Sequence, residues 1–203
     1  MVGEMFVSPH IEERRRGFAL LFGSEQMRRS VLTAQLLAAR VDEPDLVLRA
    51  QVVQALADYF EVRQQAYRYP PEVRAMVAGH LRKFDRPQLQ ALLELHCAAR
   101  EGIARLGPDS LTRLMERIPQ ASAQLTRFAG DRHAALKLRR AAIELIGRVG
   151  FTDAAQTLEG LRVRIEGRRA GQIAMTFAPS DQPDEQTLLP ALRETLQILR
   201  EIE

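Results

Sequence analysis

The sequence predicts an all-α protein, and three observations support this fold class. Ala, Leu, Arg, Glu and Gln, which favour helices, fill most segments, whereas runs of β-branched residues are scarce. Apolar residues recur at the spacing of one buried helical face in most segments. Gly, Pro and Asp separate these segments, as they do where helices begin and end. With 203 residues, 46% of them hydrophobic, the chain has enough apolar side chains for a buried core.

Capping residues and prolines divide the chain into nine expected helices. Ser8-Pro9 starts the first helix, which Gly23 ends, and Pro70-Pro71 and Asp85-Arg86-Pro87 start later ones. Pro119 falls inside the sixth helix, so a kink or two short helices are expected there. The expected helices span residues 9–22, 24–40, 45–66, 71–83, 86–106, 109–129, 133–149, 152–168 and 184–202.

After a capping helix, the remaining eight helices form four consecutive pairs. The first members of the pairs start at residues 24, 71, 109 and 152, with intervals of 47, 38 and 43 residues. A period of this length is typical of two-helix repeats. We therefore expect one domain over residues 1–203. Its parts are an N-terminal cap (1–23), repeats (24–168), an irregular insertion or arm (169–183) and a C-terminal capping helix (184–203).

Two stretches carry a specific repeat pattern. LRRAAIELIGRVG (138–150) has an aliphatic-Arg pair, alanines and an aliphatic-Gly-x-aliphatic-Gly ending. LLAARVDEPDLVLRAQVVQALADYF (36–60) has an acidic turn with proline, followed by a helix that contains an arginine. With Pro119 inside a first helix of a pair, the chain resembles the HEAT-repeat family of α-solenoids over most of residues 24–168. An irregular helical bundle is the alternative fold.

The HEAT-repeat resemblance implies a right-handed α-α superhelix of about four helical pairs. It also implies structural roles for two aspartate–arginine sets, Asp42 with Arg49 and Asp131 with Arg139. In such repeats the turn aspartate accepts free N–H groups at the start of the inner helix. The inner-helix arginine can pair with the aspartate of a neighbouring repeat. These four residues are therefore expected to hold repeats together.

The sequence contains no catalytic or metal-ligating motif. No CxxC, HExxH, P-loop, GxGxxG or GxSxG pattern occurs, and the histidines fall on different helices or turns. His96 and Cys97 are adjacent, so they point in different directions on a helix, and a buried cysteine is favoured over a nucleophile–base pair. We therefore expect no enzyme activity, no catalytic residue, no cofactor and no metal. The four histidines are His10, His80, His96 and His133.

The single cysteine and the hydropathy of the chain bear on its location. Cys97 has no second cysteine to pair with, which favours a reducing compartment. The N-terminal residues lack the layout of a secretory signal, and no apolar run reaches the ~18–20 residues that span a bilayer. A cytoplasmic protein without a membrane partner is expected.

Arginine clusters on a moderately basic chain suggest an alternative function. The net charge of the whole chain is +3. Residues 181–203 hold six acidic and two basic residues, a local net charge of −4, so residues 1–180 carry +7. Arginines at 14–16, 28–29, 139–140 and 162–169 are candidate phosphate contacts, although nearby glutamates favour a solvated surface. Nucleic-acid binding in the manner of HEAT-like DNA glycosylases is therefore the alternative. The chain has no Trp and no motif that matches the catalytic aspartate of those enzymes.

The function expected first is protein recognition by the surface that the inner helices line, as in an adaptor, regulatory subunit or assembly scaffold. On the inner helix 133–149, Arg140, Glu144 and Arg148 lie opposite the apolar stripe, and we predict that they contact a protein partner. Tyr59-Phe60, Tyr67 and Tyr69 form an aromatic cluster, for which core packing is favoured over a binding cage.

Residues 173–178 alternate between large and small side chains. Ile173, Met175 and Phe177 occupy every second position, the period of an extended strand. One interpretation is a loop that these apolar side chains hold on the helices. The other is an arm that adds to the sheet of a partner or to a second copy of the chain, which would form a homodimer.

Overall fold

The computed structural model describes residues 2–61, 69–174 and 185–202. The protein is all-helical, with 75% of its residues in helices and no strand in the described ranges. It divides into two compact units, Met1–Pro119 and Gln120–Glu203, each with its own buried apolar side chains. Within the described ranges, no helix has both the length and the hydropathy that crossing a bilayer requires. The solenoid superhelix and the single domain stay predictions.

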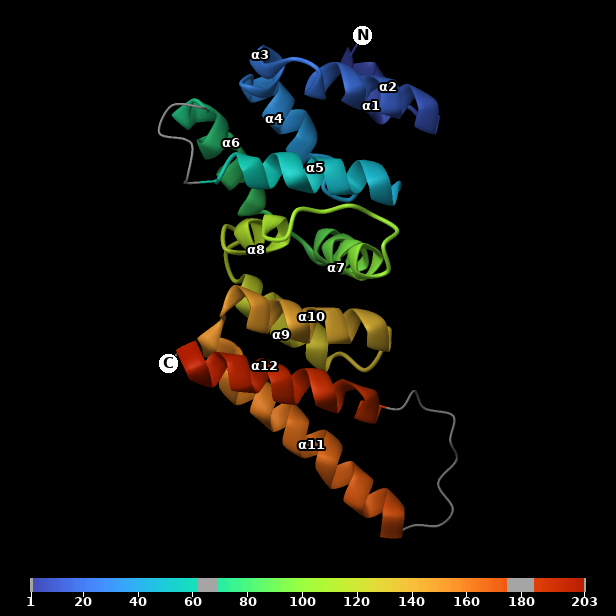
Figure 1. Cartoon of the computed structure of the whole chain (residues 1–203), viewed down its shortest axis with the longest axis vertical. Coiled ribbons are helices and arrows are strands. Elements are labelled where there is room, and N and C mark those ends of the chain that lie inside the picture. Colours follow the sequence, from blue (N-terminus) through green and yellow to red (C-terminus); the bar gives the residue numbers. More distant parts are fainter. Residues whose placement is uncertain (1, 62–68, 175–184, 203) are drawn as a thin grey trace. The chain divides into compact units, whose positions relative to one another are not determined.

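In the residues that the structure describes, the first unit contains eight helices, and its N-terminal cap consists of two of them (Figure 1). A turn at Ser8–His10 separates α1 from α2; α2 corresponds to the predicted helix 9–22, and α1 was not predicted. The rings of Phe6 and Phe18 join these two helices, with centroids 4.5 Å apart. The eight helices are α1 (Val2–Val7), α2 (Ile11–Phe22), α3 (Glu25–Arg28), α4 (Val31–Ala38), α5 (Leu46–Asp58), α6 (Pro71–Leu81), α7 (Arg86–Arg100) and α8 (Ser110–Met115).

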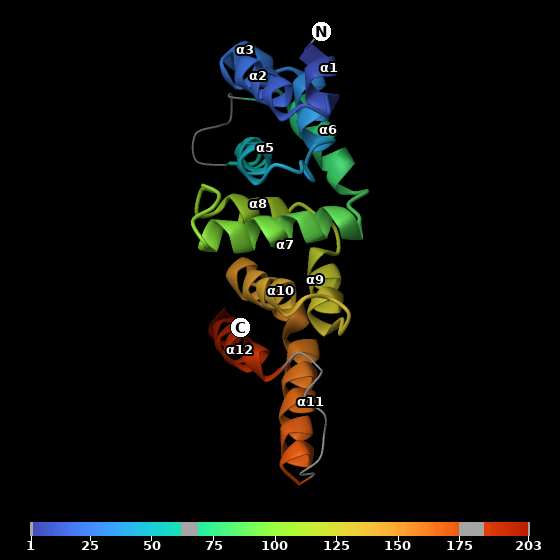
Figure 2. The same ribbon diagram turned by 90° about the vertical axis from the view of Figure 1, so that its right-hand side faces the viewer.

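Packing in the first unit agrees with the predicted repeat pairs only in part. The predicted helix 24–40 is interrupted at Arg29–Ser30, and its second half, α4, packs against α5 as expected. α4 also packs against α6, and α5 packs against α7 and α8 (Figure 2). α6 and α7, predicted to form the second pair, are not among the closely packed helix pairs of the described residues.

Helix boundaries follow the capping residues where these residues act locally. The Asp45 side chain accepts a hydrogen bond from Leu48 N–H at 2.9 Å and thereby caps α5. Asp85 and Gln88 form a capping box at the start of α7. Pro119 divides the predicted helix 109–129 into α8 and α9, and Gln120 between them has a φ of 59°.

The second unit contains α9 (Ala121–Gly130), α10 (Leu136–Val149), α11 (Ala155–Ala174) and α12 (Leu189–Ile202), with short 3₁₀ helices η1 (Thr152–Ala154) and η2 (Glu185–Leu188). α10 packs against both α9 and α12, and α11 packs against α12 (Figure 2). The predicted apolar stripe of α10 is buried except for Val149, which is half-buried. The leucines at the helical spacing of the last predicted helix are all buried: Leu188, Leu189, Leu192, Leu196 and Leu199.

α11 is longer than the sequence predicted. It continues to Ala174, so residues 169–174 of the expected irregular insertion are helical. Ile173 therefore lies within a helix and does not begin an extended strand. Met175 and Phe177, the other two residues of the proposed arm, lie outside the described residues.

Gly147 of α10 lies against Thr195 of α12. A Cβ at this position would lie 3.0 Å from Thr195 Oγ1 and 3.3 Å from its Cα. The Thr195 hydroxyl donates a hydrogen bond to the carbonyl of Ile143 at 3.1 Å, which fixes this contact. A side chain at residue 147 therefore requires Thr195 to shift by a few tenths of an ångström.

We expect Gly147→Ala to lower the free energy of unfolding by about 1–3 kcal/mol because it overpacks the contact between α10 and α12. Gly160→Ala in α11 is the control, since a Cβ there meets no atom within 4 Å. That substitution should raise stability by about 0.5–1 kcal/mol through helix propensity alone. Urea denaturation followed by circular dichroism measures both changes. Equal effects of the two substitutions would contradict the close contact.

Candidate functional site

A groove lies between α2 and α5 in the first unit. Its volume is about 540 Å³, within the range of ligand and peptide pockets. The side chains that α2 contributes are spaced three and four residues apart, and so are those of α5, so each helix presents one face to the groove. The lining residues are Arg15, Ala19 and Phe22 of α2 and Val47, Gln51, Gln54, Ala55 and Asp58 of α5, with Leu48 and Ala50 beneath them.

Two contacts fix the helices at the two ends of this groove. At the start of α5, Arg14 Nε donates to Glu43 Oε1 at 2.9 Å, and both side chains are buried. Arg14 also donates to the carbonyls of Ser8 and Pro9, at 3.0 and 3.1 Å. At the other end, the Tyr59 hydroxyl donates to the carbonyl of Arg28 at 2.9 Å. α2 and α3 are thereby held beside α5.

The far end of the groove is completed by the segment that follows α7. Gln54 Oε1 accepts hydrogen bonds from Gly107 N–H at 3.0 Å and from the Ser110 hydroxyl at 2.6 Å. Because these bonds hold the segment on α5, Arg105 lies at the groove beside Tyr59 and Arg28. Three arginines therefore line a groove with a largely apolar floor.

Tyr59 and Tyr69 pack together at this end. Their ring centroids are 4.8 Å apart in an edge-to-face arrangement, and both residues are buried. Burial raises the pKa of the Tyr59 phenol, and the nearby Tyr69 raises it further. Tyr59 therefore stays a protonated donor. Core packing, which the sequence analysis favoured for the aromatic cluster, describes these two rings; Tyr67 lies outside the described residues.

The predicted contact residues Arg140, Glu144 and Arg148 lie on one side of α10. Arg140 and Arg148 are exposed, and Glu144 is half-buried. Arg140 Nε donates to Glu144 Oε1 at 2.8 Å, so these two charges already compensate one another. Glu144 thus compensates one of the two arginines on this side of α10, and contact of these three residues with a protein partner stays a prediction.

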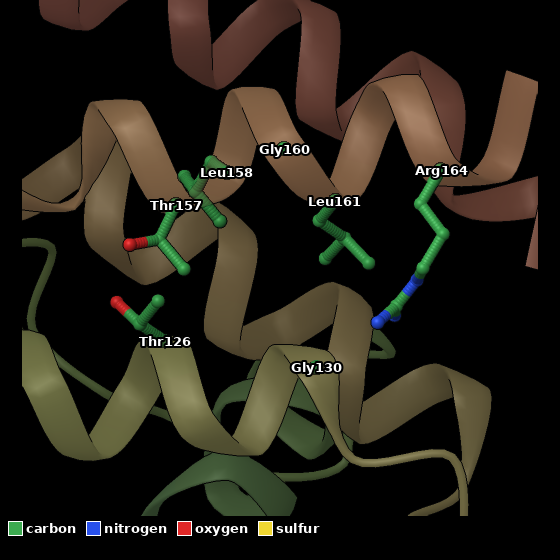
Figure 3. Close-up of a pocket in the computed structure, with 7 residues that line it drawn as sticks. All are labelled: Thr126, Gly130, Thr157, Leu158, Gly160, Leu161 and Arg164. Carbon is green, nitrogen blue, oxygen red and sulfur yellow. The ribbon is translucent and has the colours of Figure 1, made fainter.

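A smaller pocket of about 300 Å³ lies in the second unit between α9 and α11 (Figure 3). Thr126 of α9 lies across from Thr157 of α11, and Leu161 and Arg164 point toward α9. The Thr126 hydroxyl donates to the carbonyl of Ser122 at 2.7 Å, and Arg164 forms no ion pair with a described carboxylate. Arg164 is the charged residue of the lining, and Thr126 and Thr157 supply its hydroxyl groups.

Arg49 joins α5 to α7, but Asp42 takes no part. Arg49 Nη1 lies 3.1 Å from Glu94 Oε2 and donates to the carbonyl of Ala91 at 2.9 Å. Its Nε donates to the carbonyl of Glu43 at 2.6 Å. Asp42 is exposed and makes no hydrogen bond or ion pair with the described residues. Glu43, one residue later, supplies the buried carboxylate of this turn, which corrects the expectation for Asp42.

Arg139 joins α9 to η2, and Asp131 is not its partner. Arg139 Nη2 lies 2.7 Å from Glu185 Oε1, and its Nε donates to the carbonyl of Ala129 at 2.8 Å. The arginine side chain is only 1% exposed. Asp131 accepts a hydrogen bond from His133 N–H at 2.9 Å within the turn. The carboxylate beside Arg139 is that of Glu185 in η2, where an aspartate of a neighbouring repeat was expected.

The histidines and the cysteine lie apart from the groove and from the smaller pocket. Within the described ranges, no group of three or more His, Cys, Asp or Glu side chains could hold a metal ion. His96 is buried in α7 and Cys97 beside it is half-buried. His10, His80 and His133 lie at the start of α2, in α6 and in the turn before α10.

Comparisons of the chain with models of protein families, with curated proteins and with solved structures find no match. The likeness to HEAT repeats therefore stays a resemblance of the sequence, and function is argued from the groove and the charges around it.

Proposed function

We propose that the chain is a non-catalytic protein-recognition module that binds partners through the exposed faces of its inner helices. The observation that carries this proposal is the groove along α5, an inner helix in the predicted repeats, whose outward face has no covering helix among the described residues. A groove between two helices accepts an apolar helix face from a partner, which is a recurrent mode of peptide recognition. The exposed side of α10 offers a second, polar surface.

Exposed apolar side chains near the groove support a protein partner. Val47, at the rim, is 48% exposed, and Ala19 on the facing wall is exposed as well. Apolar surface rimmed by polar residues favours association with another protein. Arg15, Gln51 and Asp58 form such a rim here. The HEAT-like solenoid and the cytoplasmic location remain part of this proposal.

Affinity capture from the cell of origin tests the proposed function. Ala19→Phe puts a bulky side chain into the groove from an exposed position, so the fold is retained and the groove is filled. We expect partners that the wild-type chain retains to be lost with Ala19→Phe. The control is Ala75→Phe at an exposed site of α6 outside the groove, which should retain them. An identical set of proteins on wild type and Ala19→Phe would contradict recognition through this groove.

Ion pairing weakens the alternative of nucleic-acid binding. Arg14 and Arg139 are buried, Arg15 pairs with Glu12 at 2.8 Å, and Arg140 pairs with Glu144. Arg162 lies 2.5 Å from Glu159 and 2.6 Å from Glu166. Its hydrogen bond lowers the pKa of the Glu159 carboxyl, and that of Arg193 lowers the pKa of Glu166, so both glutamates are ionised and oppose phosphate.

We therefore expect no electrophoretic shift of duplex or single-stranded DNA by the full chain at about 50 mM or about 200 mM salt. A protein that neutralises many phosphates would bind at the lower salt and lose affinity steeply at the higher one. Strong binding with that salt dependence would favour the nucleic-acid alternative over protein recognition. A protein already known to bind DNA serves as the positive control.

A further inference from the structure

The charges along the groove are distributed unequally, and this inference about the partner rests on the proposed function. At the start of α5, Arg15 lies 2.8 Å from Glu12 and 3.8 Å from Asp45, so its charge is compensated. At the far end, Arg28 and Arg105 form no ion pair with a described carboxylate. The Tyr59 end of the groove therefore carries the excess positive charge.

The Arg28 side chain has a hydrogen-bond donor that no described residue satisfies. Its Nε is buried and has no hydrogen-bond partner among the described residues. A buried donor without an acceptor costs free energy, whereas a carboxylate placed there would form a charge-assisted hydrogen bond. Asp58 lies at the same end, but its Oδ1 already accepts from Gln54 Nε2 at 2.8 Å. The ligand chemistry that fits this end of the groove is an anionic oxygen.

The shape of the groove fits a helix. Its α5 wall runs from Val47 to Asp58, about 17 Å at the rise of an α-helix, which matches about three turns of an occupant. Ala19 and Ala55 on the facing walls are small, so a third helix can approach closely. An extended peptide would find no strand edge among the described residues to satisfy its backbone, whereas a helix satisfies its own.

We infer that the groove binds an amphipathic helix of a partner protein, with apolar side chains on one face and carboxylates at the end beside Arg28 and Arg105. The apolar face packs on Ala19, Phe22 and Ala55. Orientation is set by charge, because among the described residues the arginines of the groove that form no ion pair lie at its Tyr59 end. A helix with the opposite charge, or with the acidic residues at the other end, binds more weakly.

Selection of displayed peptides on the full chain tests this inference. The probe is a library of helical peptides of about four turns, with randomised positions. We expect enrichment of sequences with apolar residues at i, i+3 or i+4 and i+7 and with Asp or Glu clustered at one end. The selected peptides should bind Arg28→Gln/Arg105→Gln at least about tenfold more weakly than wild type, measured by fluorescence anisotropy. Arg16→Gln, an exposed α2 arginine outside the groove, should bind like wild type.

Several results would overturn the inference. These are a library without enriched sequences, enriched sequences without acidic residues, or equal affinity for wild type and the double variant. Self-association of the wild-type chain that is lost in Ala19→Phe, measured by light scattering, would assign the groove to a second copy instead. If captured proteins depend on Ala19 while the selected peptides lack acidic residues, protein recognition stands and only the acidic helix is wrong.

Discussion

Glu43→Ala is expected to lower the free energy of unfolding of the first unit by about 3–5 kcal/mol. The Glu43 side chain is fully buried, and its partner Arg14 is 10% exposed. Removing the carboxylate leaves the Arg14 guanidinium buried with only the carbonyls of Ser8 and Pro9 as acceptors. It also removes the acceptor for Asp45 N–H, which lies 3.3 Å from Glu43 Oε1. α2 would then lose its buried ion pair with the turn before α5, while Arg15 would still lie 3.8 Å from Asp45.

Two further variants separate this effect from a general loss of charge. Glu12→Ala removes an exposed pair with Arg15 in the same unit and should change stability by less than about 0.5 kcal/mol. Arg14→Met combined with Glu43→Leu removes both charges and should recover most of the loss. Hydrogen exchange resolved along residues 1–119 locates the change. A loss below about 1 kcal/mol for Glu43→Ala would show that the buried pair does not hold α2.

The local part of this fold could be predicted from the sequence. Asp45 and Asp85 cap helices because their side chains accept from N–H groups three residues later, which sequence alone specifies. Pro119 divides a helix because proline lacks the N–H and clashes with the preceding turn. The apolar stripe of α10 predicts its buried face because helical periodicity is independent of the partner helix.

The partners of the buried arginines could not be predicted in the same way. Arg49 pairs with Glu94, 45 positions further along the chain, and Arg139 pairs with Glu185, 46 positions further along. Such pairs depend on which helices pack together, whereas the resemblance to HEAT repeats implied an aspartate of a neighbouring repeat as the partner of each arginine. The groove also escaped prediction, because it joins faces of α2 and α5 whose proximity depends on Arg14 and Glu43. The turn also holds Asp42 and Asp45, so nothing in the sequence indicated that Glu43 is the acidic residue that is buried.

Arg139→Ala is expected to have the largest effect in the second unit, a loss of about 3–5 kcal/mol in the free energy of unfolding. The arginine is nearly inaccessible to solvent, and Glu185, its partner at 2.7 Å, is 16% exposed. Truncation leaves the Glu185 carboxylate and the carbonyl of Ala129 without the guanidinium. Ala129 lies near the end of α9, and Glu185 starts η2. The substitution therefore removes the side chain of α10 that contacts both of these elements.

The adjacent arginine provides the control for this prediction. Arg140 is also an arginine of α10, but its side chain is 50% exposed and its ion pair with Glu144 lies on the surface. Arg140→Ala should therefore cost no more than about 0.5 kcal/mol. Arg139→Lys should fall between the two, because an ammonium keeps the charge but not the planar geometry that reaches both acceptors. Thermal unfolding and hydrogen exchange over residues 120–202 measure the three variants. If Arg139→Ala and Arg140→Ala cost the same, the difference in burial has no energetic consequence, and Arg139 cannot be what joins α9 to the start of the last helix.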